Sequence, residues 1–176
     1  MLQTIKEKIL DMCRMSSLVY FGKQEMALRY NQHNISVLQK CKAEPKLINN
    51  TEDYNDGQAF MTVYDNEGLL VFRGSETIRD WMSDFNVVRV KMDVKGLTEM
   101  EKPLVHYGFI RQYRSLEDQI HFEINEYVNK YNIKTLNVAG HSLGGALASI
   151  AAIQLHHEFP RLNICCYTFG SPRPGD

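Results

Sequence analysis

Residues 134–148 read Lys-Thr-Leu-Asn-Val-Ala-Gly-His-Ser-Leu-Gly-Gly-Ala-Leu-Ala. Within this stretch, Gly140-His-Ser-Leu-Gly144 fits the pattern G-x-S-x-G, and an apolar strand over 134–139 leads into it. A helix is expected over about 143–158, which places the serine on a sharp turn between a strand and a helix. The two glycines, each two residues from the serine, give the room that such a turn needs. This stretch therefore predicts both a sheet with a helix packed on it and a functional serine.

A serine on such a turn is placed to act as a nucleophile. The turn forces Ser142 into a strained backbone conformation, which lifts its hydroxyl clear of the sheet edge. The following helix aims its amino-terminal dipole at the position where an oxyanion would form. The backbone N–H of Leu143, the residue after the nucleophile, is the expected first oxyanion donor. The alternative is a glycine-rich turn in which Ser142 merely caps the helix.

The segments around this turn predict an α/β fold. Residues 162–169 form the next apolar run, and a helix between two such strands is a βαβ unit, which implies a parallel pair and a right-handed crossover. Two earlier strands, 60–64 and 69–72, flank good turn residues and predict a hairpin. The expected class is an α/β-hydrolase-type mixed, mainly parallel sheet flanked by helices. Further helices are expected over 3–20, 76–85 and 109–130, a short element near 35–38, and no regular element over 86–103.

Composition restricts the class of protein. The 176 residues suit one domain, 1–176, and a net charge of -1 gives no reason to expect nucleic acid or an anionic membrane as a partner. No apolar run approaches membrane-spanning length, and the charged, amphipathic start is unlike a secretory signal, so we expect a cytoplasmic protein. The four cysteines include no Cys-x-x-Cys pair, which predicts buried free thiols and no zinc site. Serine-based acyl transfer requires no metal or cofactor.

Four blocks in the same order resemble the class 3, or fungal-type, lipase family. They are Val71-Phe-Arg-Gly-Ser75 with Asp80, Trp81 and Asp84, then Val105-His-Tyr-Gly-Phe109, then Val138 to Ala148, and finally Phe169-Gly-Ser-Pro-Arg173. Together they span 71–173, over half of the chain. The resemblance implies a lipase or carboxylesterase that hydrolyses acylglycerol or phospholipid esters at a lipid–water interface, in lipid metabolism.

The same resemblance implies roles for individual residues. Ser142 matches the family's nucleophile, and Ser75 matches the residue that supplies the second oxyanion N–H. Residues 76–85 match the lid, in which Trp81 would present an apolar face to lipid. From the residues alone, Ser75 is more often an ordinary turn serine, and a single tryptophan on a short helix is more often part of a core.

The sequence does not supply a base for this serine. In this class of hydrolase the chain order is Ser, then Asp or Glu, then His. His156 and His157 are 14 and 15 residues along the helix, roughly 20 Å from the serine, which is beyond proton-transfer range. His141 is interpreted as a packing residue and His106 as the family's structural histidine. His33 and His121 have no supporting context, and Asp176 is a weak candidate for the acid.

Two explanations for the missing acid and base remain open. The chain is either a fragment of a longer lipase, apparently truncated at the carboxyl terminus, or a short paralogue that keeps the front half of the fold without activity. The first explanation is favoured because residues 172–176 end in a loop. Either way, these 176 residues alone are expected to show little turnover. The other functional alternatives are a catalytically inactive binding or scaffold protein, and a thioesterase or peptidase with the same turn.

Overall fold

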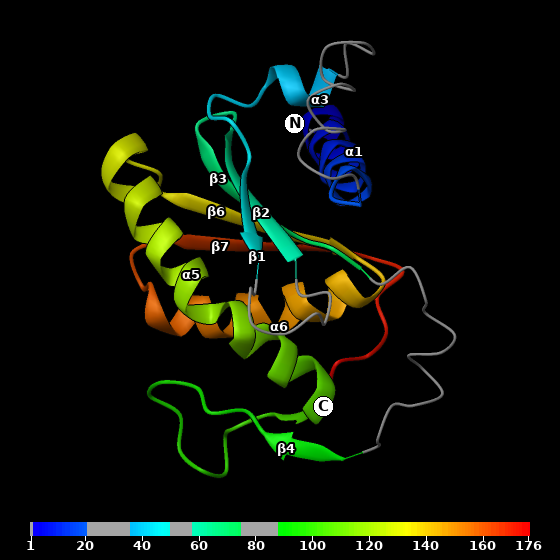
Figure 1. Ribbon diagram of the computed structural model, residues 1–176, viewed down its shortest axis with the longest axis vertical. Helices are drawn as coiled ribbons and strands as arrows, with labels where there is room; N and C mark the ends of the chain where they lie inside the picture. The colour runs from blue at the N-terminus through cyan, green and yellow to red at the C-terminus, as the bar shows by residue number, and fades with distance from the viewer. Residues whose placement is uncertain (1, 21–35, 50–57, 75–87) are drawn as a thin grey trace.

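The computed structural model describes residues 2–20, 36–49, 58–74 and 88–176. Along these residues two helices come first and five strands follow, and helices and strands then alternate (Figure 1). The helices are α1 (Leu2–Leu18), α3 (Ser36–Gln39), α5 (Tyr107–Tyr131) and α6 (Leu143–Glu158). The strands are β1 (Lys46–Asn49), β2 (Gln58–Tyr64), β3 (Glu67–Phe72), β4 (Arg89–Lys91), β5 (Leu104–His106), β6 (Thr135–His141) and β7 (Asn163–Phe169).

The strands form one mixed sheet of five and a small sheet of two. In the larger sheet the order is β1-β2-β3-β6-β7. The pairs β1–β2 and β2–β3 are antiparallel, whereas β3–β6 and β6–β7 are parallel. Helix α6 joins the parallel neighbours β6 and β7, as expected of a βαβ unit, and β4 pairs with β5 separately. The expected α/β class is confirmed.

The predicted hairpin is present, with a tighter turn than the sequence indicated. Strand β2 extends to Tyr64 and β3 begins at Glu67, so only Asp65 and Asn66 connect them. Both connecting residues have positive φ, 47° and 67°. A two-residue loop with positive φ at both positions matches the right-handed twist of paired strands, and Asp and Asn tolerate it better than other non-glycine residues. This hairpin leads into β3, the strand next to β6.

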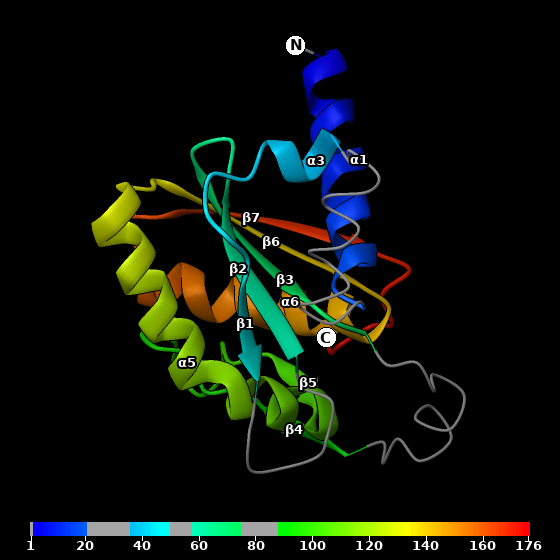
Figure 2. The same ribbon diagram turned by 45° about the horizontal axis from the view of Figure 1, so that its top comes forward.

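Helices cover both faces of the sheet and enclose two cores. Helices α5 and α6 lie side by side on one face, and α1 and α3 lie on the other (Figures 1 and 2). The core under α5 and α6 includes Phe72, Tyr113 and Leu147, and the core under α1 includes Met12 and Phe60. The two cores lie on opposite faces of the central strands, and the serine turn follows the carboxyl end of one of these strands, β6.

The structure also differs from expectation in several places. Strand β1 and the pair β4–β5 were not predicted; their three or four residues each are too few to show periodicity. The expectation of buried thiols is wrong: Cys13 and Cys166 are exposed, and Cys41 and Cys165 are only partly buried, although all four cysteines are free. Cys166 lies on β7, the edge strand of the described sheet, where no residue is fully buried. The helix expected over 76–85 lies outside the described residues.

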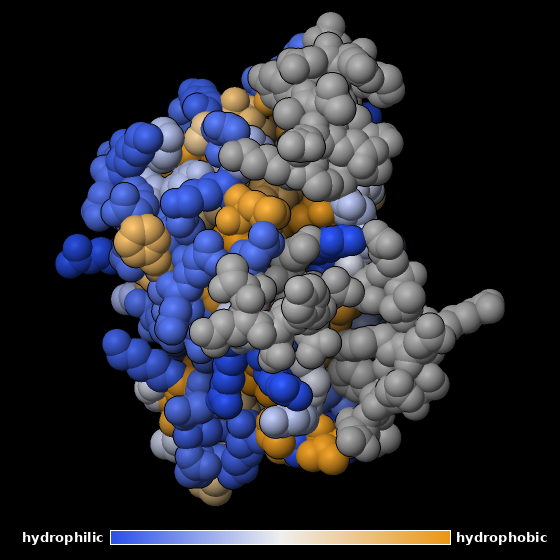
Figure 3. All heavy atoms as spheres, viewed as in Figure 1, coloured by the Kyte–Doolittle hydropathy of each residue, from blue (hydrophilic) through white to orange (hydrophobic). Residues whose placement is uncertain are grey.

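The surface is mixed in character. On the face that carries α5, hydrophilic residues cover most of the helix, and apolar residues gather in a central strip beside it (Figure 3). Within the part of the chain that the structure describes, no helix combines the length and apolar character needed to cross a membrane.

Candidate active site

Ser142 is the only residue between β6 and α6. Strand β6 ends at His141 and α6 begins at Leu143. The backbone of Ser142 has φ 56° and ψ -126°, a conformation that non-glycine residues rarely adopt and that costs of the order of 1–3 kcal/mol. Three hydrogen bonds hold it there: its N–H donates to the Phe169 carbonyl at 2.9 Å, and its carbonyl accepts from the Gly145 N–H at 2.9 Å and the Ala146 N–H at 3.4 Å. The strained turn expected from the sequence is present.

The glycines of the motif are explained by the close approach of backbone segments. A Cβ atom on Gly140 would lie 2.1 Å from the Gly144 carbonyl oxygen. A Cβ atom on Gly144 would lie 2.3 Å from the carbonyl oxygen of Phe72, the last residue of β3. The turn is therefore wedged directly against the end of β3, and only residues without a side chain fit at these two positions.

The Ser142 side chain does not cap the helix. Ser142 occupies the N-cap position of α6, but its hydroxyl makes no capping hydrogen bond, and the residue is only 6% exposed. A serine that merely served as a cap would accept a hydrogen bond from an N–H of the first turn. The capping interpretation is therefore wrong, and the hydroxyl is free of the helix backbone.

The two predicted oxyanion donors differ in what the structure shows of them. Leu143 begins α6, and among the described residues no acceptor pairs with its N–H, as is usual in a first helical turn. Ser75 lies outside the described residues. Its neighbour Gly74 lies against the turn, because a Cβ atom there would be 2.7 Å from the His141 carbonyl oxygen.

His141 has a polar contact that the sequence analysis missed. The residue is exposed, and its Nδ1 atom lies 3.1 Å from the hydroxyl oxygen of Tyr20, just after α1. The two rings meet edge to face, with centroids 6.1 Å apart. His141 therefore packs against Tyr20, as a packing residue would, and also makes a polar contact that links the serine turn to the end of α1. No pattern in the sequence pointed to Tyr20.

The other described histidines lie in separate surroundings. His156 and His157 are in the last turn of α6, at the opposite end of the helix from Ser142, as expected. The ring of His106, which precedes α5, meets Phe109 edge to face. His121 pairs with Glu158, its Nε2 atom 2.6 Å from the carboxylate oxygen Oε2. His33 lies outside the described residues.

Asp176 is engaged away from the serine turn. Its carboxylate oxygen Oδ1 lies 2.6 Å from the Nη1 atom of Arg89 on β4, and its backbone N–H donates to the Leu104 carbonyl. Both of these partners belong to the two-stranded sheet. This ion pair gives Asp176 an evident structural role.

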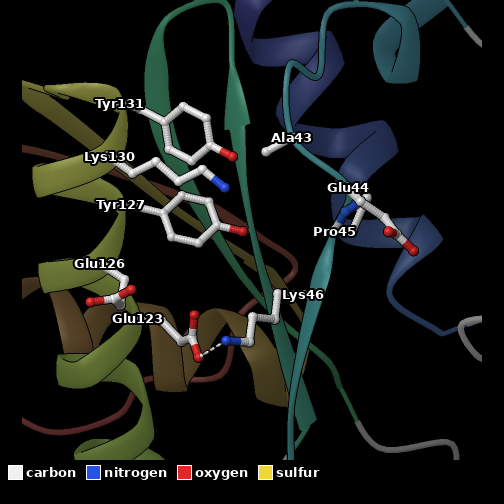
Figure 4. A pocket seen from close by; sticks show the side chains of 9 residues that line it. All are labelled: Ala43, Glu44, Pro45, Lys46, Glu123, Glu126, Tyr127, Lys130 and Tyr131. Atoms are coloured by element: carbon white, nitrogen blue, oxygen red, sulfur yellow. Dashed lines mark ion pairs between the residues drawn. The ribbon is translucent and has the colours of Figure 1, made fainter.

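A hollow of about 490 Å³ lies elsewhere, between α5 and the chain that leads into β1. Figure 4 shows Tyr127 and Tyr131 on its α5 side, and Lys46 reaching across to Glu123. The Lys46 Nζ atom lies 2.6 Å from the Glu123 oxygen Oε1. None of the predicted site residues lines this hollow, and it is separate from the serine turn.

Fold and turn together define the class of protein. A mixed sheet, whose parallel strands carry a strained serine at the start of the crossover helix, is the arrangement of an α/β-hydrolase. The family model described as lipase (class 3) matches residues 69–176, well over half of the chain. The chain belongs to the class 3 lipase family.

Individual relatives agree with this assignment. A lipase of Rhizomucor miehei is 33% identical over 123 residues, which cover 68% of this chain and 31% of the relative. A secreted alkaline triacylglycerol lipase of Penicillium cyclopium is 35% identical over 91 residues, 52% of this chain and 32% of the relative. The solved triacylglyceride lipase of Rhizomucor miehei superposes with a TM-score of 0.79 at 26% identity, and the match covers all of this chain and 65% of that structure. The match therefore spans about a third of these curated relatives.

Proposed function

We propose that this chain supplies the nucleophile and the oxyanion donors of a lipase or carboxylesterase. The Ser142 oxygen would attack the carbonyl carbon of an ester, the alcohol would leave, and water would release the acid from the acyl-enzyme. The observation that carries the proposal is the backbone of Ser142, with φ 56° at the single residue between β6 and α6. A strained turn with a hydroxyl that caps nothing has no evident structural purpose, whereas it suits a nucleophile.

The oxyanion would be stabilised from two sides of the turn. On one side is the N–H of Leu143, which has no acceptor among the described residues and points from the amino terminus of a sixteen-residue helix. On the other side we place the N–H of Ser75. This proposal is supported by Gly74, the residue before Ser75 in the sequence, which adjoins the His141 carbonyl.

The proton of Ser142 needs a base, which we propose comes from outside the described residues. Among the histidines that the structure describes, His121 is in ion-pair contact with Glu158, and His156 and His157 are at the far end of α6. His141 is next to the serine in sequence, but its Nδ1 atom is engaged with Tyr20. None of these side chains has the position of a base with an orienting acid behind it.

The substrate that we propose is an acylglycerol or phospholipid ester at a lipid–water interface. The names of the relatives support acylglycerols, because one is called a triacylglyceride lipase and another a triacylglycerol lipase. The lid proposed over 76–85 with Trp81, and the cytoplasmic location, stay predictions. The family membership favours a lipid ester over a thioester or a peptide.

The nucleophile can be tested with a fluorophosphonate probe on protein made from the complete reading frame. We expect the probe to label the wild type and not the Ser142→Ala variant. Hydrolysis of emulsified triacylglycerol should fall by a factor on the order of 10⁶ in the variant. The control is Ser149→Ala, in the same helix, whose hydroxyl donates to the Gly145 carbonyl and whose loss should leave labelling unchanged.

Three outcomes would contradict the proposal, the last of them in its substrate alone. If Ser142→Ala keeps its ester hydrolysis, another residue is the nucleophile. If the folded wild type neither reacts with the probe nor hydrolyses any ester, the protein is a lipase-like binding protein without activity. Hydrolysis of thioesters or peptides in preference to acylglycerols would retain Ser142 and overturn the substrate.

A further inference from the structure

A seam of polar side chains runs between α5 and α6, on the face of the sheet that both helices cover (Figures 1 and 2). On α5 it consists of Tyr113, Glu117 and His121, which are spaced by four residues and therefore share one face of the helix. On α6 it consists of Gln154 and Glu158, again four residues apart. Polar groups between two packed helices are uncommon and call for an explanation.

Three of these side chains converge. One donor atom each from Glu117, His121 and Glu158 lies within 4.8 Å of the other two. His121 Nε2 is 2.6 Å from Glu158 Oε2, and both side chains are mostly shielded, with exposed fractions of 29% and 23%. The His121 ring is also held edge to face against Phe159, with centroids 5.7 Å apart. The cluster is therefore oriented by its surroundings and joins the two helices.

The other two members of the seam are buried and incompletely satisfied. Tyr113 is fully buried, and within the described ranges its hydroxyl has no hydrogen-bond partner. Burial, and then the charges of Glu117 and Glu158, raise the pKa of this phenol. Gln154 is 5% exposed; its Nε2 atom is 3.5 Å from Glu117 Oε1, while its own Oε1 has no partner among the described residues. Both side chains lead toward the cluster.

We propose that Glu117, His121 and Glu158 form a binding site for a divalent transition-metal ion, with Zn²⁺ as the best match. One imidazole nitrogen and two carboxylate oxygens are a common donor set for zinc, and a water molecule would complete four-coordination. Ca²⁺ and Mg²⁺ prefer six or more oxygen ligands and fit this set less well. The ion would neutralise two carboxylates that share a partly buried site with a single imidazole.

Binding requires only a small rearrangement. Tetrahedral coordination at ligand distances of about 2.0–2.2 Å separates donor atoms by roughly 3.3–3.5 Å. His121 Nε2 and Glu158 Oε2 are now 2.6 Å apart and would separate by less than about 1 Å. The Glu117 oxygen already lies within 4.8 Å of both atoms, so it would need to move only slightly closer. The Gln154 amide nitrogen, 3.5 Å from Glu117 Oε1, is placed to orient that carboxylate, as outer groups of zinc sites commonly do.

The site would act as a clamp between helices. Glu158 is the last residue of α6, whose first residue follows Ser142, whereas Glu117 and His121 lie on the middle of α5. A bound ion would fix the far end of the helix that carries the serine turn. It would stabilise the fold and take no part in ester hydrolysis, which needs no metal.

The proposal can be tested by titrating the metal-free full chain with Zn²⁺ in a calorimeter and with Co²⁺ in a spectrophotometer. We expect one Zn²⁺ per chain, a rise in Tm that EDTA reverses, and the visible absorption of four-coordinate Co²⁺. Glu117→Gln and His121→Gln should each weaken Zn²⁺ binding by at least about tenfold. His156→Gln, an exposed histidine two residues before Glu158, and Glu126→Gln, an exposed glutamate of α5, should change it by less than about twofold.

Several results would overturn the proposal. If the wild type shows no saturable binding at millimolar Zn²⁺, the cluster is only an ion pair between His121 and Glu158. Loss of binding in His156→Gln, with retention in His121→Gln, would place the metal on the exposed histidines at the end of α6. If a variant fails to fold, the wild-type NMR signals decide: the ring protons of His121 must shift on adding Zn²⁺ while those of His156 stay, and the reverse contradicts the site.

Discussion

At the scale of single residues, the serine turn depends on glycines, whose lack of a Cβ atom allows close contacts. Gly144 and Gly145 follow one another at the start of α6, but a side chain on each would meet a different kind of neighbour. On Gly144 it would meet the backbone of β3, with the Phe72 carbonyl oxygen 2.3 Å away. On Gly145 it would meet the side chain of Ser171, whose Cβ would be 2.7 Å away. The two positions therefore differ in whether the neighbour can be removed.

We predict that Gly144→Ala and Gly145→Ala both lower the free energy of unfolding, by about 1–3 kcal/mol each, because each overpacks a close contact. Adding Ser171→Gly should restore most of the loss in Gly145→Ala, since it removes the Cβ atom that clashes. The same addition should not restore Gly144→Ala, whose clash is with backbone. Urea denaturation of the single and double variants measures both cycles. Equal rescue of the two variants would contradict this account of the turn.

At the scale of elements, the long helix α5 ends at a residue with an unusual backbone. Asn132 has φ 52° and ψ 38°, in the left-handed region, and its N–H donates to the Val128 carbonyl. Glycine is the most common residue at such helix ends, and asparagine is the usual substitute. This conformation turns the chain from α5 toward Ile133, which is buried.

We predict that Asn132→Ala lowers the free energy of unfolding by about 1 kcal/mol, because a Cβ-bearing residue without asparagine's local hydrogen bonding pays the left-handed penalty. Asn132→Gly should cause no loss. The matched control is Asn129→Gly, on the exposed side of the last turn of α5, where the same glycine should be destabilising because it weakens a helix. Thermal denaturation ranks the stability of the three variants. Similar losses of stability in Asn132→Gly and Asn132→Ala would refute the role assigned to the left-handed backbone.

The elements predicted from the sequence are those whose apolar residues repeat regularly over many positions, or those next to a specific turn motif. Helix α5, expected over 109–130, is Tyr107–Tyr131, and α6 begins and ends where expected, because their apolar residues repeat over many turns. Strand β1 was missed since only one of its four residues, Ile48, is buried. For the site, G-x-S-x-G was sufficient to place Ser142. The cluster around His121 was not predictable, because Glu158 is 37 residues away and reaches it only through helix packing.

At the scale of the whole molecule, one buried carboxylate ties together three segments on the α1 face of the sheet. Asp11 of α1 is 3% exposed. Its Oδ2 atom lies 2.5 Å from the Lys40 Nζ atom, just after α3, and accepts a hydrogen bond of 2.6 Å from the Tyr64 hydroxyl of β2. Burial by itself would raise the pKa of Asp11, but the hydrogen bonds from Lys40 and Tyr64, with the charges of Lys40 and Arg14, outweigh it and lower the pKa.

This lowered pKa makes stability on the α1 face depend on pH in a definite direction. The folded state binds the Asp11 proton more weakly than the unfolded chain does, so the carboxylate stabilises the fold above the unfolded pKa, near about 3.9. That contribution is lost as pH falls through the lower folded pKa. Asp11→Asn, which cannot ionise, should therefore be less stable than the wild type at neutral pH, and the gap should narrow as pH falls below about 4.

Urea denaturation of the wild type and Asp11→Asn at a series of pH values from 7 to about 3 measures this gap. Asp118→Asn, an exposed carboxylate of α5, is the control, and its difference from the wild type should be small throughout because the side chain joins no buried network. A gap for Asp11→Asn that stays constant over this range would mean that the loss comes from altered packing and not from the charge. A gap that widens in acid would reverse the assigned direction of the pKa.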